Sequence, residues 1–100
     1  MKLIDLPRYH VFQFEGEKNI HLLNENYQNA LTGACQFEWH RIYKDGRTNL
    51  NGTFANSPEW LESQEVTDLG DFYDWMKQNH PRKYIKEDWE ASKHKKEDKA

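Results

Sequence analysis

The pattern of apolar and polar side chains predicts a β-strand in each of two stretches in the first half of the chain. Residues 9–14 are rich in β-branched and aromatic side chains and stop at Gly16. Residues 34–43 alternate strictly and lead into Asp45-Gly46, a dipeptide that favours a two-residue type I′ turn. The pattern therefore predicts one early strand and a β-hairpin centred on this turn.

The same turn predicts which side chains of the hairpin share a face. A two-residue turn places Trp39 opposite Gly52 and Phe37 opposite Phe54. One face is then apolar and suited to a core, whereas the other is expected to be exposed. The predicted core face contains Phe37, Trp39, Tyr43, Leu50 and Phe54, and the other face contains Gln36, Glu38, His40, Ile42, Asn49, Asn51 and Thr53.

Residues 19–31 fit two different templates. The helical period favours a helix, with Gly33 where a C-terminal cap belongs, although four asparagines weaken it. The alternative is a hairpin through residues 15–18 with a second strand at residues 19–23. We favour the helix, and the choice between helix and hairpin stays open. The apolar face of that helix would contain Ile20, Leu23, Tyr27, Ala30 and Leu31.

The second half of the chain predicts two helices. The tripeptide Ser57-Pro58-Glu59 is typical of a helix start, because serine caps, proline fits the first turn and glutamate complements the helix dipole. Thr67 or Asp68 is expected to cap a longer helix that ends at residues 80–81. The apolar side chains of this helix, which we expect to pack on the core face of the hairpin, are Leu69, Phe72, Tyr73 and Met76.

These elements predict an α+β fold: a small antiparallel sheet, made from a strand, a helix and a β-hairpin, followed by two C-terminal helices. One hundred residues suit a single domain. The composition changes after Pro81, because residues 82–100 are rich in lysine and glutamate. We therefore expect a globular domain over residues 1–81 and a flexible charged tail over residues 82–100, partly helical or disordered.

Charge is distributed unevenly along the chain. Residues 1–81 carry a net charge of −5 and residues 82–100 a net charge of +2. Between Thr48 and Met76 there is no lysine or arginine, yet an acidic residue recurs at every third position from residue 59. On a helix, Trp75 would lie between two of these acids, which is typical of a recognition anchor. The candidate partner-binding residues are Glu59, Glu62, Glu65, Asp68, Asp71, Asp74 and Trp75.

The acidic row has three interpretations: a solvated helix face, a surface for a basic protein, or a mimic of nucleic acid. Three residues of helix advance about 4.5 Å. Duplex DNA offers one charge per about 1.7 Å and a single strand one per about 3.4 Å. The row is therefore too dilute to imitate DNA alone, so among the functional interpretations a protein-binding surface is favoured.

The sequence allows two other classes of function. Aromatic and basic side chains on the hairpin resemble a stacking platform for nucleic acid, although the net negative charge of residues 1–81 repels phosphate. An enzyme or enzyme subunit is the third interpretation, but neither a nucleophile beside a base nor a phosphate-binding glycine loop is present in the sequence. The candidate nucleic-acid-binding residues are Arg41, Lys44, Arg47, Arg82 and Lys83.

The cysteine and histidine pattern indicates no metal site and no cofactor. Cys35 is the single cysteine, falls on the core face and is expected to be inert. The five histidines form no HxxxH or HxH pair. A single cysteine, no signal-peptide pattern and no long apolar run predict a cytoplasmic protein that does not enter a membrane.

The sequence thus predicts a small, non-enzymatic binding or inhibitor module, monomeric or homodimeric, whose acidic surface engages a basic protein. Nucleic-acid-handling proteins are one class of basic partner, and inhibitors of phage or plasmid origin have this size and charge.

Overall fold

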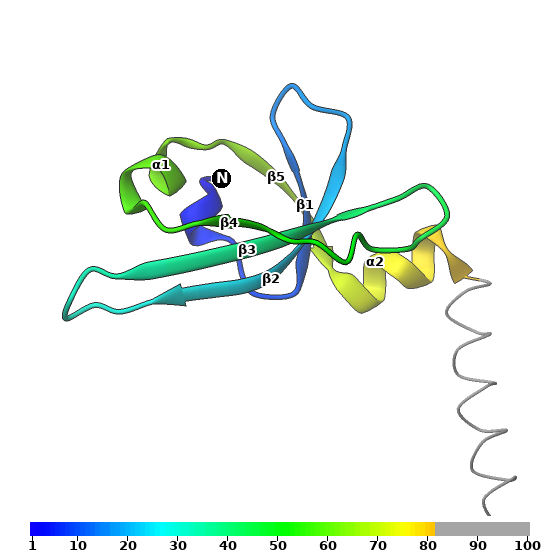
Figure 1. Cartoon of the computed structure of the whole chain (residues 1–100). Helices are drawn as coiled ribbons and strands as arrows, with labels where there is room; N and C mark the ends of the chain where they lie inside the picture. Colours follow the sequence, from blue (N-terminus) through cyan, green and yellow to red (C-terminus); the bar gives the residue numbers. More distant parts are fainter. Residues whose placement is uncertain (82–100) are drawn as a thin grey trace, which may run out of the picture.

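The computed structural model describes residues 1–81 and contains a five-stranded antiparallel sheet in the order β4-β3-β2-β1-β5, with two α-helices (Figure 1). The α+β class is therefore confirmed for this part of the chain, and the predicted tail lies outside it. The strands are β1 (His10–Phe14), β2 (Ile20–Gln28), β3 (Cys35–Ile42), β4 (Thr53–Ala55) and β5 (Val66–Asp71), and the helices are the 3-10 turn η1 (Leu3–Asp5), α1 (Pro58–Ser63) and α2 (Phe72–Asn79).

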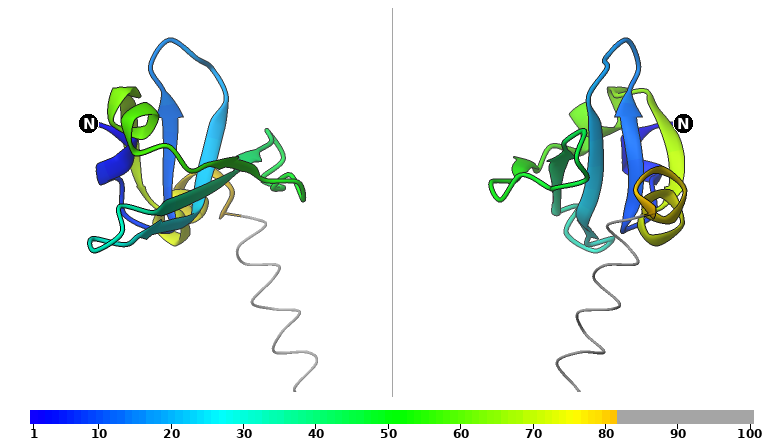
Figure 2. Two further views of the ribbon diagram at one scale, coloured as in Figure 1. Left: turned by 60° about the vertical axis from the view of Figure 1, so that its left-hand side comes forward. Right: turned by 90° about the vertical axis from the view of Figure 1, so that its right-hand side faces the viewer.

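The main core lies between one face of the sheet and the two short segments η1 and α1. These segments lie side by side (Figure 2, left). Leu61 of α1 is fully buried, and burying such a side chain contributes roughly 2 kcal/mol. The buried residues of this core are Leu3, Leu6, Phe12, Leu23, Cys35, Phe37, Trp39, Leu61 and Val66.

Several sequence predictions are confirmed. The early strand is β1, and the first strand of the hairpin is β3. Helix α1 begins as its sequence indicates, with Pro58 in its first turn and the Ser57 side chain accepting a hydrogen bond from the Trp60 backbone N–H. Cys35 is buried, as predicted.

The helix predicted at residues 19–31 is wrong, because residues 20–28 form strand β2 between β1 and β3. The hairpin alternative gave the right element but ended it too early. Two neighbouring strands supply hydrogen bonds along β2, and this tertiary pairing overrides the helical period. A β-bulge between Leu23 and Glu25 shifts the alternation in mid-strand. Because of that shift, the sequence of β2 does not show the continuous two-residue alternation of a regular strand.

The predicted register of the hairpin is also wrong. Phe37 lies opposite Ala55, and Phe54 lies opposite Glu38. A shift of one residue moves a side chain to the other face, so Phe54 is 59% exposed rather than in the core. The turn is one residue longer than predicted, because the Tyr43 N–H donates to the Arg47 carbonyl and Ile42 lies opposite Thr48. The connection before β4 then takes up two more residues, which brings Thr53 opposite Trp39. Leu50, also predicted in the core, lies in this connection and is 93% exposed.

The longer C-terminal helix starts later than predicted. Residues 66–71 form β5, which pairs with β1 along the edge of the sheet. Helix α2 then begins at Phe72 and contacts β5 and β1, not the Phe37 and Trp39 face (Figure 2, right). Met76 is buried as expected, whereas Tyr73 is largely exposed. Edge pairing with β1 therefore outcompetes the helical pattern of the acidic row.

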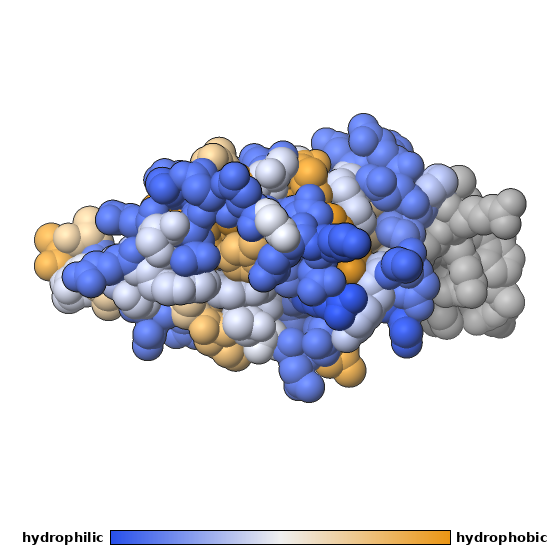
Figure 3. All heavy atoms as spheres, turned by 90° about the horizontal axis from the view of Figure 1, so that it is seen from above, coloured by the Kyte–Doolittle hydropathy of each residue, from blue (hydrophilic) through white to orange (hydrophobic). Residues whose placement is uncertain are grey.

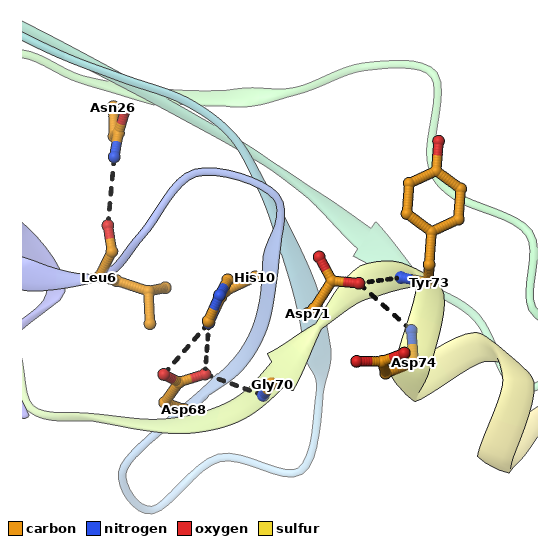
Figure 4. A network of polar contacts seen from close by, with 8 residues as sticks. All are labelled: Leu6, His10, Asn26, Asp68, Gly70, Asp71, Tyr73 and Asp74. Atoms are coloured by element: carbon orange, nitrogen blue, oxygen red, sulfur yellow. Dashed lines mark hydrogen bonds and ion pairs between the residues drawn. The ribbon is translucent and has the colours of Figure 1, made fainter.

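Asp71 determines where α2 begins. Its carboxylate accepts hydrogen bonds from the backbone N–H groups of Tyr73 and Asp74, at 3.0 and 3.3 Å (Figure 4). We expect Asp71→Ala to lower the free energy of unfolding in urea by about 1 kcal/mol, because two N–H groups lose their acceptor. Asp71→Asn retains a capping oxygen and should restore most of the loss. Equal destabilisation by both substitutions would show that the cap does not stabilise the helix.

Candidate functional site

Three aromatic rings from distant parts of the chain meet beside the β1–β2 loop. Phe14 ends β1, Trp39 lies in β3, and Trp60 belongs to α1. The Trp39 and Trp60 rings are stacked, with centroids 5.9 Å apart and planes 8° apart. Phe14 contacts Trp39 edge-on at 5.7 Å. The three rings line an open pocket of about 450 Å³, which we call the acidic groove. The residues that line it are Phe14, Glu15, Glu17, Trp39, Trp60, Ser63, Gln64 and Glu65.

The two tryptophans play different parts in the acidic groove. Trp39 is only 5% exposed and belongs to the core, whereas Trp60 is 40% exposed. Trp60 therefore covers the buried ring and presents surface of its own to solvent. Its position depends on the Ser57 cap, because that side chain fixes the first turn of α1.

The lining of the acidic groove contains three glutamates and no lysine or arginine. Glu65 is already paired, because Lys2 lies 2.6 Å from its carboxylate. Hydrogen bonds from Lys2 and from the Met1 amino group lower the pKa of Glu65. Within residues 1–81, neither Glu15 nor Glu17 pairs with a lysine or arginine. These two carboxylates carry the uncompensated negative charge of the acidic groove.

A histidine without hydrogen-bond partners lies next to the acidic groove. His21 is 9% exposed, and its ring lies 5.4 Å from both Phe12 and Phe14. Neither ring nitrogen has a hydrogen-bond partner among the described residues. Burial lowers the pKa of His21, Arg41 lowers it further, and Glu17, 4.0 Å away, raises it only in part. The ring is therefore neutral at pH 7.

The structure does not gather the acidic row into one surface. Asp68 accepts hydrogen bonds from His10 at 2.9 Å and from the Gly70 N–H at 2.8 Å (Figure 4). Burial raises the pKa of Asp68, but these two hydrogen bonds and the electrostatic attraction to His10 together lower the pKa overall. Asp71 caps α2 and Glu65 pairs with Lys2. The row is thus divided among α1, β5 and α2.

The remaining members of the predicted partner-binding set fall into separate regions. Glu59 and Glu62 are exposed on α1, where they flank Trp60. Asp74 is exposed on α2, near the other end of the fold (Figure 1). Trp75, the predicted anchor, lies in a different pocket. Sequence reasoning missed the acidic groove, because the residues that line it meet only in the fold. Its one local sign was the two acids Glu15 and Glu17 after Phe14, which do not by themselves indicate a groove.

The second pocket is basic. It encloses about 480 Å³, includes Trp75, and has no aspartate or glutamate in its lining. Of the predicted nucleic-acid-binding residues, Arg41 and Lys44 line it together with Lys18. Arg47 is paired with Asp45 at 2.6 Å, whereas residues 82 and 83 lie outside the described part of the chain. This basic groove is lined by Lys18, Asn19, Ile20, Arg41, Ile42, Tyr43, Lys44, Trp75, Asn79 and His80.

The polar face of β3 is less exposed than predicted. Glu38 accepts hydrogen bonds from Asn24 at 2.7 Å and from His40 at 2.9 Å. His40 also contacts the Asn49 carbonyl through its other ring nitrogen. The hydrogen bonds from His40 and Asn24 lower the pKa of Glu38. This half-buried network supports the β3–β4 connection, and its groups already have partners.

Other chemistries find little support in the described residues. Over residues 1–81, no group of three or more histidine, cysteine, aspartate or glutamate side chains is placed to hold a metal ion. None of the helices in this part is long and apolar enough to cross a membrane. Seen from above, hydrophilic residues cover most of the visible face and hydrophobic residues form small patches on it (Figure 3). The two grooves are therefore the features that bear most directly on function.

Comparisons with protein-family models, curated proteins and solved structures found no match to this chain.

Because His21 is buried, we expect the stability of the fold to depend on pH. The pKa of His21 in the folded protein lies below its ordinary value of 6.5, so as pH falls through that value the unfolded chain binds more protons than the folded chain. We expect the free energy of unfolding to decrease from pH 7.5 to pH 5, and His21→Phe to flatten this slope. Urea unfolding at several pH values gives the free energy of unfolding of the unchanged protein and of the His21→Phe variant. The contributions of the other histidines cancel when one curve is subtracted from the other. Parallel curves would contradict the assignment.

Proposed function

We propose that this protein is a non-enzymatic binding module that engages a basic protein partner through the acidic groove. One observation carries the proposal: the partly exposed Trp60 ring lies in a pocket that three glutamates line and no lysine or arginine enters. Tryptophan in a partly closed pocket is a frequent source of binding energy. A pocket of one charge sign favours a partner of the opposite sign.

The proposed mechanism separates two tasks. Glu15 and Glu17 at the groove, with Glu59 and Glu62 on α1, create the negative potential that speeds encounter with a basic surface. Trp60 then supplies apolar contact area that slows dissociation. Salt should therefore act mainly on the association rate, because it screens the electrostatic attraction and not the apolar contact with Trp60.

The proposal keeps the acidic surface predicted from sequence but moves its anchor. Trp75 lines the basic groove, so it is poorly placed to anchor a basic partner. Trp60 lies between Glu59 and Glu62 in the sequence of α1 and opens onto the acidic groove. An inhibitor of a nucleic-acid-handling protein fits this description, because the grooves of such proteins carry positive charge.

A second candidate function is supported by the basic groove. Lys18, Arg41 and Lys44 line it together with the aromatic rings of Tyr43 and Trp75. Cations beside stacking rings are what single-stranded nucleic acid requires. The two candidates need ligands of opposite charge, and they are separated by the sign of the ligand that binds.

The acidic-groove proposal predicts a charge-dependent partner. The full-length chain is immobilised, a lysate of the source cells is passed over it, and the captured protein is purified for binding kinetics. We expect Glu15→Gln combined with Glu17→Gln to lower the association rate constant several-fold and to flatten its dependence on salt, because steering carboxylates are removed.

The matched control is Glu25→Gln combined with Asp74→Asn, which changes the net charge equally but away from the acidic groove. This control should retain both the rate and its salt dependence. The proposal fails if the two double variants behave alike, or if the captured material is nucleic acid removed by nuclease.

A further inference from the structure

We propose that the acidic groove receives an arginine side chain of the partner, with its guanidinium stacked on Trp60 and paired with Glu15 or Glu17. The inference rests on the proposed function, since it names the chemical group through which a basic partner would bind. It is carried by the arrangement of the rings and by the pairing state of the three glutamates.

The rings form a platform rather than a cage. An aromatic cage for a methylated ammonium group surrounds an empty centre with ring faces. Here the two tryptophan rings lie parallel, 8° apart, and Trp39 is 5% exposed. Trp39 therefore packs against Trp60, and Trp60 holds more of the exposed aromatic surface in the acidic groove. A planar guanidinium can lie flat on such a surface, whereas the ammonium of lysine is compact and more strongly hydrated, so its contact with the ring is weaker.

The carboxylates distinguish the same two cations. Glu65 is occupied by Lys2, which leaves Glu15 and Glu17 as acceptors at the groove. A carboxylate can accept two parallel N–H bonds from one guanidinium, a geometry that lysine cannot provide. The carboxylates thus favour arginine over lysine because the guanidinium is planar, which is also why the Trp60 ring favours it.

The surroundings of the platform do not oppose a cation. No lysine or arginine lines the acidic groove. His21, buried against Phe14, is neutral at pH 7 because burial lowers its pKa. A guanidinium on Trp60 therefore meets negative charge at the rim and no fixed positive charge beneath.

The test is a titration of the full-length chain followed by NMR of the tryptophan indole N–H signals. The probes are N-acetyl-arginine amide, the corresponding lysine amide, and the citrulline amide, which keeps the shape of arginine without its charge. We expect saturable shifts of the Trp60 signal with arginine, binding at least threefold weaker with lysine, and no saturation with citrulline. Equal binding of lysine or of citrulline would overturn the proposal.

Variants locate the binding. Trp60→Phe should weaken arginine binding at least threefold, and so should the Glu15→Gln and Glu17→Gln double variant, whereas Trp75→Phe should leave it unchanged. Urea unfolding of each variant confirms that the fold is retained, and Trp60→Phe is chosen because it keeps an apolar ring on α1. Weakening by Trp75→Phe instead of Trp60→Phe would overturn the assignment.

Failure of this inference is distinguishable from failure of the proposed function. If the captured partner depends on the groove carboxylates but arginine amide does not bind, the binding module stands and the arginine platform falls. If arginine amide binds at Trp60 but the groove carboxylates do not affect the captured partner, the platform stands and the proposed function falls.

Discussion

The fold depends on covering one apolar face of a twisted sheet with very little chain. Phe37 and Trp39 of β3 are buried, and within residues 1–81 the helical segments on their side of the sheet are η1 and the six residues of α1. Leu61 completes the packing, but Trp60 covers the edge and keeps 40% of its surface exposed. A small domain buries a limited share of its surface. The acidic groove is the region where this cover ends, so the site follows from the shortage of covering structure.

Pairing between β1 and β5 determines where the acidic residues at every third position from residue 59 lie in the fold. Once residues 66–71 form the edge strand, Asp68 lies within reach of His10, and Asp71 stands at the junction where a cap is needed. A carboxylate that stabilises a helix start or holds a histidine is committed to the fold. Periodicity in charge along a sequence therefore indicates a surface only if one element spans the whole repeat.

Local signals were predicted well, and signals that depend on partners were not. The serine cap at Ser57 and the strict alternation in β3 act within a few residues, and both are found. The bulge after Leu23 depends on pairing with β3, so periodicity misled there. The turn after Tyr43 is the exception among the local signals, because Asp45-Gly46 indicated a two-residue turn and the structure has a longer one. The acidic groove could not be predicted, because residues 14, 39 and 60 meet only through the sheet.

The net charge of residues 1–81 conceals two regions of opposite sign. The acidic groove is lined by three glutamates and the basic groove by two lysines and one arginine, and neither lining contains charge of the other sign. Screening at physiological salt limits each potential to about 8 Å, so a ligand is governed by the groove it enters rather than by the total charge. The net charge of residues 1–81 alone would predict that anions are repelled from the whole of their surface. Separation of the charges allows each groove to select its own ligand, and the aromatic ring in each gives the selected ligand a surface to pack against.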